Sequence, residues 1–541
     1  MRLTTLAHCL SLVVTAMIGQ GCSSAAGPDA AGDEADVTSR VATKLKAAGA
    51  KACTDKDKAG WLCLDLEVPL DHFDPANTKK IKVGFAIHQA PNKTRQGMFV
   101  NATGGPGYSG LDEPDDYTST DKRITAAFDI VHFDLRGVGR SGKLGCKPAA
   151  KAFYAGGLRA ASKADDDALV TKSRTFAQDC VTQMGIPKAD VQFYNSRQAI
   201  EDVDALRALM EEDKITLYGL SYGTQFMQTY ARFHADHVRA LVIDGSVDLS
   251  LSHLDYMKNL NSGIALLLDK TLTTCAADAA CASGFTTAPG ATAKARAFAA
   301  YDAVAAKLEA GAVKIPFKRK SGKVEQRTYT RKDFDTTTFN AMGDPDGRRD
   351  LPRALAAAFQ RDDFAPTLAL SYAAAGIEPE TAGLTGSAGA DEGMSDAIYY
   401  AFTCNDYGKD GQTEAATLKN YLDVGQSIRA ASPRILAPYY GDLPCVFWPS
   451  THVEEPVPVL AAAGVPIIVV GATGDGATPY NMGESVFHGL ADGYLVTVEG
   501  EKHVMFGRGN ECVDKPIIEF FLTGQRPQKR ETHCEGVFAS K

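Results

Sequence analysis

Strand-like and helix-like patterns of apolar residues alternate along the chain between residues 61 and 245. Segments 61–69 and 80–87 alternate apolar and polar positions, which predicts antiparallel strands at the edge of a sheet. Four short and nearly continuous apolar runs follow, at 97–102, 128–134, 214–220 and 238–245. Helical periodicity marks the segments 149–184 and 196–212. This alternation predicts an α/β unit built on a mostly parallel sheet.

The pattern changes between residues 250 and 455. Long segments rich in alanine and leucine predict helices at 264–282, 291–310, 351–359 and 364–375, and one hairpin is expected at 314–330. No catalytic pattern falls in this region, which we interpret as an inserted, mainly helical cap domain. Apolar strands resume at 465–471 and 493–498, with a helix at 482–490 between them. We therefore expect a core formed by 46–249 and 456–541, separated by a cap at 250–455.

The N-terminus has the features of an export signal. Arg2 precedes an apolar run over residues 10–18, which is too short to remain in a membrane as a spanning anchor. Cys22 lies where a bacterial lipoprotein carries its lipidated cysteine, so we expect a signal peptide at 1–22, followed either by a lipid anchor at Cys22 or by simple secretion. The segment 23–45 is rich in alanine, glycine and aspartate, which predicts a flexible tether.

The charge of the chain argues against a nucleic-acid partner. The 541 residues carry a formal net charge of −9, and the densest basic run is only Lys318-Arg319-Lys320. No stretch after the leader is long and apolar enough to cross a bilayer. We expect an exported monomer that touches the membrane only through the possible anchor at Cys22.

Cysteines point to disulfide bonds. Two of the 12 cysteines, Cys9 and Cys22, fall in the leader, and an even number in the rest of an exported chain is typical of disulfides. Proximity along the chain suggests the pairs Cys53–Cys63, Cys146–Cys180, Cys275–Cys281, Cys404–Cys445 and Cys512–Cys534, although sequence alone does not establish connectivity. Zinc is a weaker alternative, because the chain has neither a C-x-x-C nor an H-E-x-x-H motif. We expect no metal and no cofactor.

A candidate nucleophile follows the strand at 214–220. Gly219-Leu220-Ser221-Tyr222-Gly223 fits the G-x-S-x-G pattern, and helix-like sequence follows it directly. A sharp strand-to-helix turn exposes a serine hydroxyl above the sheet and needs glycines where a Cβ would clash. The alternative is an ordinary strand–turn–helix junction with a chance serine.

Two glycine-rich loops follow earlier strands. The loop at 103–110 can bring backbone N–H groups close to a ligand, so we expect an oxyanion hole formed by the N–H of Tyr222 and that of Gly104 or Gly105. The second loop, at 137–142, fits G-x-G-x-x-G. We reject a dinucleotide site there, because the following segment 143–148 is not expected to open a helix.

An acid and a histidine complete the candidate site. Asp475 follows the strand at 465–471 and His503 follows the strand at 493–498, so both should lie at the same sheet edge as Ser221. A histidine that takes the serine proton and an acid that orients the histidine form a catalytic triad. The rivals are less well placed: His488 lies inside a helix, His533 in the tail and Asp492 before its strand, while His234 and His237 have metal-like spacing without an evident third ligand.

These motifs resemble those of a known family. The segments 101–110, 134–141, 219–224, Asp244-Gly245, 475–479, the Cys404 and Cys445 neighbourhoods and the Cys512…Cys534 tail look like the tripeptidyl aminopeptidase branch of the α/β-hydrolase family, related to proline iminopeptidases. The resemblance covers the chain from about Cys53 to Cys534. It implies an α/β-hydrolase fold with a helical cap, and a secreted serine exopeptidase that releases short peptides, such as tripeptides, from a free N-terminus.

The resemblance leaves the substrate open. An aminopeptidase must bind the substrate ammonium, and Asp396 and Asp406 in the cap are the candidates, with solvated surface acids as the alternative. Two departures from the family pattern bear on specificity: Lys502 and Val504 flank His503 in place of glycines, and Thr103 replaces a histidine of iminopeptidases. A carboxylesterase with the same triad and a non-catalytic binding protein are the alternative functions.

Overall fold

The computed structural model describes most of the chain after the leader. The described residues are 41–54, 60–91, 95–112, 121–374, 379–380, 393–407, 409, 411–436, 438–449 and 464–536. The predicted signal peptide, Cys22 and residues 23–40 of the predicted tether lie outside them. The tether prediction is wrong for residues 41–45, which are helical, because Val41 and Leu45 are buried against the core.

The core is a ten-stranded sheet in the order β1-β2-β3-β5-β4-β6-β7-β10-β11-β12. Its strands are β1 (Lys51–Ala52), β2 (Leu62–Pro69), β3 (Lys80–His88), β4 (Met98–Ala102), β5 (Asp129–Phe133), β6 (Ile215–Leu220), β7 (Val238–Asp244), β10 (Ile467–Ala472), β11 (Gly493–Glu499) and β12 (Glu531–Glu535). The strands β1 to β3 pair antiparallel at one edge, and from β5 to β12 all pairs are parallel. The predicted mostly parallel sheet with an antiparallel edge is confirmed.

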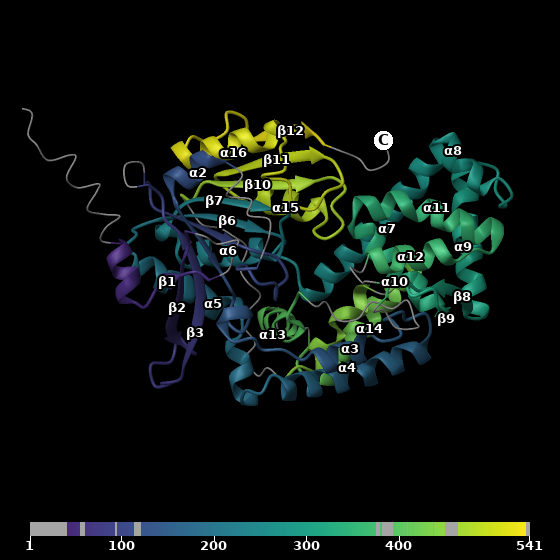
Figure 1. Ribbon diagram of the computed structural model, residues 1–541, viewed down its shortest axis with the longest axis horizontal. Helices are drawn as coiled ribbons and strands as arrows, with labels where there is room; N and C mark the ends of the chain where they lie inside the picture. Colours follow the sequence, from purple (N-terminus) through teal and green to yellow (C-terminus); the bar gives the residue numbers. More distant parts are fainter. Residues whose placement is uncertain are drawn as a thin grey trace, which may run out of the picture.

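Helices cover both faces of this sheet (Figure 1). The helices of the α/β core are α2 (Lys122–Ala127), α3 (Lys147–Tyr154), α4 (Lys163–Gln183), α5 (Ser196–Leu209), α6 (Tyr222–Phe233), α15 (Tyr480–Gly489) and α16 (Glu511–Thr523). Successive strand residues face opposite sides of a sheet. Accordingly, Phe99 packs in one apolar cluster with α2 and α16, whereas its neighbour Val100 packs in another with α5, α6 and α15. The continuous apolar runs of the sequence reflect this burial on two faces.

The inserted helices form a second hydrophobic cluster. The elements α7 (His253–Ala277), α8 (Ala279–Ala282), α9 (Ala293–Ala310), β8 (Val313–Lys318), β9 (Val324–Tyr329), α10 (Arg331–Gly343), α11 (Pro345–Arg361) and α12 (Ala365–Ala374) supply its residues, from Ile264 to Tyr372. They gather in the half of the molecule away from the sheet (Figure 1). The strands β8 and β9 form the predicted hairpin.

The last part of the predicted cap packs differently. Helices α13 (Asp396–Asp406) and α14 (Glu414–Ala431) and the 3-10 segment η6 (Pro438–Phe447) share the hydrophobic cluster of the core, through residues such as Tyr400 and Trp448. The boundary of 250–455 therefore encloses one separate helical body and one group of helices that belongs to the core packing. None of the helices in the described residues has the length and apolar composition that a membrane span requires.

All five predicted cysteine pairs are bonded in the structure. Cys404–Cys445 joins α13 to η6, and Cys512–Cys534 joins α16 to β12. Each cross-link stabilises the fold by roughly 2–4 kcal/mol in the chain-entropy description.

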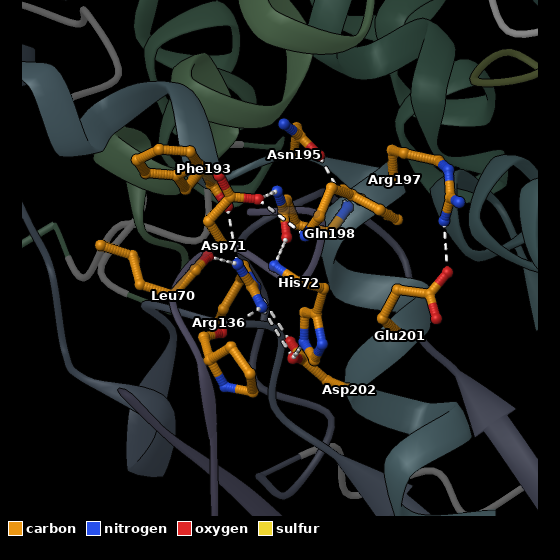
Figure 2. Close-up of polar contacts among 12 residues, drawn as sticks. Leu70, Asp71, His72, Arg136, Phe193, Asn195, Arg197, Gln198, Glu201 and Asp202 are labelled. Carbon is orange, nitrogen blue, oxygen red and sulfur yellow. Dashed lines mark hydrogen bonds and ion pairs between the residues drawn. The ribbon is translucent and has the colours of Figure 1, made fainter. Parts of the chain in front are cut away.

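The loop 134–142 has a structural role. Figure 2 shows the fully buried Arg136 guanidinium between β2 and α5, where Nη2 and Nε bind the two Asp202 oxygens at 2.7 and 2.9 Å. Nη1 donates to the carbonyls of Leu70 and Phe193, and His72 donates to Asp202 at 2.8 Å. The helix α3 begins at Lys147, so the expectation that 143–148 opens no helix is wrong for its last two residues. This helix begins five residues after the last glycine of the loop, Gly142, and not directly on the glycines as a dinucleotide fingerprint requires.

The substitution Arg136→Met should destabilise the protein by about 3–5 kcal/mol, because it leaves the buried Asp202 carboxylate without its cation. The midpoint of guanidinium unfolding, read by fluorescence, measures this. The matched control is Arg140→Met, which breaks a half-exposed pair with Asp65 and should cost less than about 1 kcal/mol. Equal midpoints for the two variants would contradict the assignment.

Candidate active site

The turn at Ser221 has the geometry of a nucleophile elbow. Ser221 lies between β6 and α6 with φ 55° and ψ −126°, a conformation that costs a non-glycine residue about 1–3 kcal/mol. A Cβ on Gly219 would lie 2.4 Å from the Gly223 carbonyl oxygen, and one on Gly223 would lie 2.1 Å from that of Ala102. A side chain at either position would therefore clash with a backbone carbonyl oxygen, so both positions need glycine, as the pattern predicted.

Asp475 and His503 are joined in the structure. The His503 ring donates from Nδ1 to Oδ2 of Asp475 at 2.7 Å. The Asp475 side chain is 1% exposed, and it accepts further bonds from the N–H of Ala477 and from the N–H and hydroxyl of Thr478. These donors hold the carboxylate in one orientation, so the ring is presented with Nε2 available for proton transfer.

The backbone brings Ser221 and His503 together through one segment. The Ser221 N–H donates to the Asp244 carbonyl at 3.0 Å, and a Cβ on the next residue, Gly245, would lie 3.0 Å from Cε1 of His503. Among the described residues, neither the Ser221 hydroxyl nor Nε2 of His503 has a hydrogen-bond partner. Hydrogen bonds between a nucleophile and its base often tighten only in the substrate complex.

The pKa of His503 lies above its ordinary value. Burial disfavours the charged ring, but the charge of Asp475 and its hydrogen bond outweigh that effect. His503 must be neutral to accept the Ser221 proton, so activity should be lost as the pH falls through this raised pKa. We expect kcat/KM to fall in acid with a midpoint above about 6.5, the ordinary histidine value. A pH profile with a midpoint clearly below that value would contradict the ion pair.

Backbone donors are placed for an oxyanion. A Cβ on Gly104 would lie 3.2 Å from Cβ and 3.4 Å from Oγ of Ser221, so the glycine loop passes directly beside the nucleophile. Within the described part of the chain, the N–H groups of Gly104, Gly105 and Tyr222 donate no hydrogen bond. These N–H groups meet the requirement for an oxyanion hole, which stays a prediction.

A cavity of about 160 Å³ opens onto Ser221. Its lining contains four tyrosines and a single carboxylate among the described residues: Gly105, Pro106, Ser221, Tyr222, Gln225, Val247, Tyr256, Tyr399, Thr403, Tyr407, Asp442, Ala477 and Thr478. The carboxylate is Asp442, which is 2% exposed and accepts bonds from the Tyr399 hydroxyl at 3.0 Å and from His253 at 3.1 Å. Burial and the charge of Asp442 raise the pKa of Tyr399, which keeps this hydroxyl a donor.

The two acids proposed from the sequence for the ammonium do not line this cavity. Asp396 borders a different cavity, of about 260 Å³, beside Gly107 and Lys147. Asp406 is 1% exposed and binds Ser196 through its N–H and hydroxyl and Gln225 through Nε2. Gln225 faces the cavity and Asp406 lies behind it. Both acids are buried, so the surface-acid alternative is wrong for them as well.

Sequence reasoning missed Asp442. The only local signal is an acid at the end of the aromatic run Tyr439-Tyr440-Gly441-Asp442. Nothing in that run indicates that it meets the loop after β6, more than two hundred residues earlier in the chain.

The rival residues have other contacts. Asp204 is the third group beside His234 and His237 that the sequence did not reveal. Its carboxylate already accepts bonds from Arg207 at 2.6 Å, Tyr230 at 2.8 Å and His237 at 2.8 Å. This cluster is therefore a satisfied ion-pair network on α5 and α6.

The remaining rivals lie away from the site. Asp492 pairs with Arg526 at the opposite end of the sheet. His488 lies at the end of α15, and His533 lies within β12, the last strand of the sheet.

Two family models match the segments that build this site. The model described as alpha/beta hydrolase fold matches residues 98–284, which include Ser221. The model described as TAP-like protein matches residues 436–534, which include Asp442, Asp475 and His503. The chain has the α/β-hydrolase fold.

Some relatives of this α/β hydrolase are named as peptidases and others as esterases. It is 26% identical over 498 residues to serine protease Hip1 of Mycobacterium tuberculosis, covering 87% of each chain. It is 27% identical over 485 residues to the tripeptidyl aminopeptidase of Streptomyces lividans, covering 87% of this chain and 83% of that one. Carboxylesterase B of Mycobacterium tuberculosis is 27% identical over 476 residues, with 86% and 85% covered. The resemblance to the tripeptidyl aminopeptidase branch is confirmed, and the chain is a serine hydrolase.

Proposed function

We propose that this α/β hydrolase is an exported aminopeptidase that releases short peptides, such as tripeptides, from free N-termini. Ser221, His503 and Asp475 act as nucleophile, base and orienting acid. Five disulfides support export, since such bonds form in oxidising compartments. Lipidation at Cys22 is the proposed means of retention at the cell envelope.

Asp442 carries the proposal of an aminopeptidase. The Asp442 carboxylate binds the Tyr399 hydroxyl and His253, and the described lining of the Ser221 cavity contains no lysine or arginine that would neutralise it from the cavity side. A substrate ammonium would supply that charge and meet tyrosine oxygens and ring faces, which also attract cations. An ester with an apolar acyl group would instead leave the Asp442 carboxylate with only the Tyr399 hydroxyl and His253 as partners.

The chemistry follows from the positions of the groups. The Ser221 hydroxyl attacks the peptide carbonyl carbon while its proton moves to Nε2 of His503. The N–H groups of Tyr222 and of Gly104 or Gly105 stabilise the oxyanion, each by roughly 3–4 kcal/mol. His503 then gives the proton to the departing amine, and water releases the acyl peptide from Ser221 by the same steps in reverse.

The cavity favours an exopeptidase. Its volume of about 160 Å³ is small, and residues from α7, α13 and η6 form part of its lining together with Ser221. A peptide can therefore place only a short N-terminal stretch between Asp442 and Ser221. The distance between ammonium and scissile bond would set the length of the released peptide.

The substitution Asp442→Asn should lower kcat/KM for a free-amine tripeptide amide by about 100-fold, because it removes the charge that pairs with the ammonium. Turnover of a short acyl ester, which has no ammonium, should stay within about threefold of wild type. Release of the chromogenic amine or alcohol measures both. The matched control is Asp396→Asn, which removes a buried acid of the neighbouring cavity and should leave the amine-to-ester ratio unchanged.

Three substrates separate the candidate functions. An alanyl-prolyl-alanyl chromogenic amide, its N-acetylated counterpart and a short acyl ester are compared on the purified mature protein. Cleavage of the free-amine peptide alone supports the aminopeptidase. Ester turnover without peptide cleavage would make the protein a carboxylesterase, and inactivity on all three with no covalent labelling of Ser221 would indicate a binding protein.

A further inference from the structure

The segment Asp244-Gly245 belongs to the motifs of the sequence but has no role in the chemistry described above. Asp244 is the last residue of β7, the strand that lies in the sheet between β6, which precedes Ser221, and β10, which precedes Asp475. Asp244 is completely buried, and its carboxylate does not line the Ser221 cavity. A buried carboxylate is costly without donors, so its partners indicate its role.

The partners of the Asp244 carboxylate lie on the loop that carries His503. It accepts the N–H of Met505 at 3.1 and 2.9 Å and the N–H of Phe506 at 2.7 Å. The Tyr218 hydroxyl of β6 is a further donor, at 3.2 Å. One carboxylate therefore binds the backbone two and three residues after the catalytic base.

This loop needs such support. Val504, between His503 and Met505, has φ 65° and is 3% exposed. A left-handed conformation is a genuine outlier for a β-branched residue and costs about 1–3 kcal/mol. A glycine would adopt this conformation freely, whereas at Val504 the surrounding contacts must hold it.

Gly245 lies directly against the His503 ring. Its φ is 69°, and a Cβ there would lie 3.0 Å from Cε1 and 3.2 Å from Nδ1 of His503, and 2.9 Å from the Thr478 hydroxyl. The His503 ring therefore packs against a residue that has no side chain. A side chain at this position would crowd the His503 ring and the Thr478 hydroxyl that binds Asp475.

We propose that Asp244-Gly245 is a second positioning device for the catalytic histidine, in which Asp244 holds the His503 loop through the Met505 and Phe506 N–H groups and its negative charge stabilises the imidazolium. Two charges therefore favour protonated His503, those of Asp475 and Asp244, and Arg508 opposes them. Burial raises the pKa of Asp244 to about 6, although the hydrogen bonds from the Phe506 and Met505 N–H groups act to lower it. At a pH where His503 is neutral and active, the Asp244 carboxylate is therefore ionised. The inference rests on the proposed serine chemistry, whichever substrate the enzyme prefers.

The test is Asp244→Asn, assayed on any substrate that wild type cleaves. Loss of loop support and of the charge should lower kcat by about 10- to 100-fold, with KM within about threefold because Asp244 does not line the cavity. Removal of a negative charge beside the imidazolium should also move the acid limb of kcat/KM to lower pH by about 0.5 unit. A merely structural role for Asp244 would not move this limb.

The matched control is Asp248→Asn, which changes a buried acid four residues further on. Within the described chain, its carboxylate accepts hydrogen bonds from the N–H and hydroxyl of Ser250. It should keep the wild-type pH profile. A folded Asp244→Asn enzyme with wild-type kcat and an unmoved acid limb would overturn the proposal.

Gly245→Ala provides a second variant that changes no charge. It should lower kcat by displacing the His503 ring, and it should slow labelling of Ser221 by a fluorophosphonate in parallel. Wild-type turnover by folded Gly245→Ala would overturn the role of the segment. Labelling also separates the two proposals: a wild-type protein that neither labels nor turns over substrate refutes the serine chemistry, whereas normal wild type with unaffected variants refutes only this inference.

Discussion

Replacing Ser221 by alanine should lower kcat by about a millionfold, to the limit of detection, while the protein remains folded. The substitution removes the only atom that can form the acyl-enzyme, and it leaves the oxyanion donors and the cavity in place. It should not relieve the backbone strain at this position, because a φ of 55° is as unfavourable for alanine as for serine. Release of a chromogenic amine from the tripeptide amide, followed over hours at high enzyme concentration, measures the loss.

The control for this prediction is Ser262→Ala, which removes an exposed hydroxyl on α7 that donates to the Lys258 carbonyl. It should keep full activity and full labelling by a fluorophosphonate. Ser221→Ala that still labels at a stoichiometry of one would show that another residue is the nucleophile.

Replacing Asp475 by asparagine should lower kcat by about 10⁴-fold. The carboxylate accepts the Nδ1 proton of His503, and an amide in its place can donate to Nδ1 and so favour the tautomer that carries its proton on Nε2. A ring protonated on Nε2 cannot accept the Ser221 proton. The loss should be smaller than that of Ser221→Ala, because the nucleophile and the oxyanion donors remain.

The same substitution at Asp492 is the control. Asp492 lies between the helix α15 and the strand β11 of the C-terminal region, and it pairs with Arg526 at the end of the sheet away from Ser221. Asp492→Asn should change kcat by less than about twofold. A large loss at Asp492, or none at Asp475, would require a different acid. Comparison of kcat/KM on ester and amide substrates shows whether either loss depends on the leaving group.

The fold was predictable where burial imposes a local pattern. Strands covered on both faces read as continuous apolar runs, and each of β4, β5, β6, β7, β10 and β11 was located in this way. By contrast, β12 has only Cys534 buried and was not predicted, because a strand at the exposed edge carries no apolar pattern. The helices α13 and α14 were assigned to the cap, since amphipathic sequence does not say which body a helix packs against.

The candidate site was predictable to the same extent. Ser221, Asp475 and His503 each directly follow a strand, and the carboxyl ends of parallel strands share one edge, so their order along the chain was enough to bring them together. The carboxylate that lines the Ser221 cavity, Asp442, could not be found in this way. Asp396 and Asp406 were reasonable choices by position, but the cavity is closed by η6, which carries Asp442.

The sequence by itself determined the α/β core, the elbow at Ser221 and the order of the candidate triad residues, because each depends on residue type and on short-range spacing. It suggested the cysteine pairs, and the structure shows them bonded. Only the tertiary structure decided that Asp442 borders the cavity, that Asp244 binds the loop of His503 and that Val504 is held at φ 65°. These depend on contacts between segments more than two hundred residues apart. Such contacts leave no periodic trace in the chain, since they follow from packing and from the need of buried carboxylates for donors.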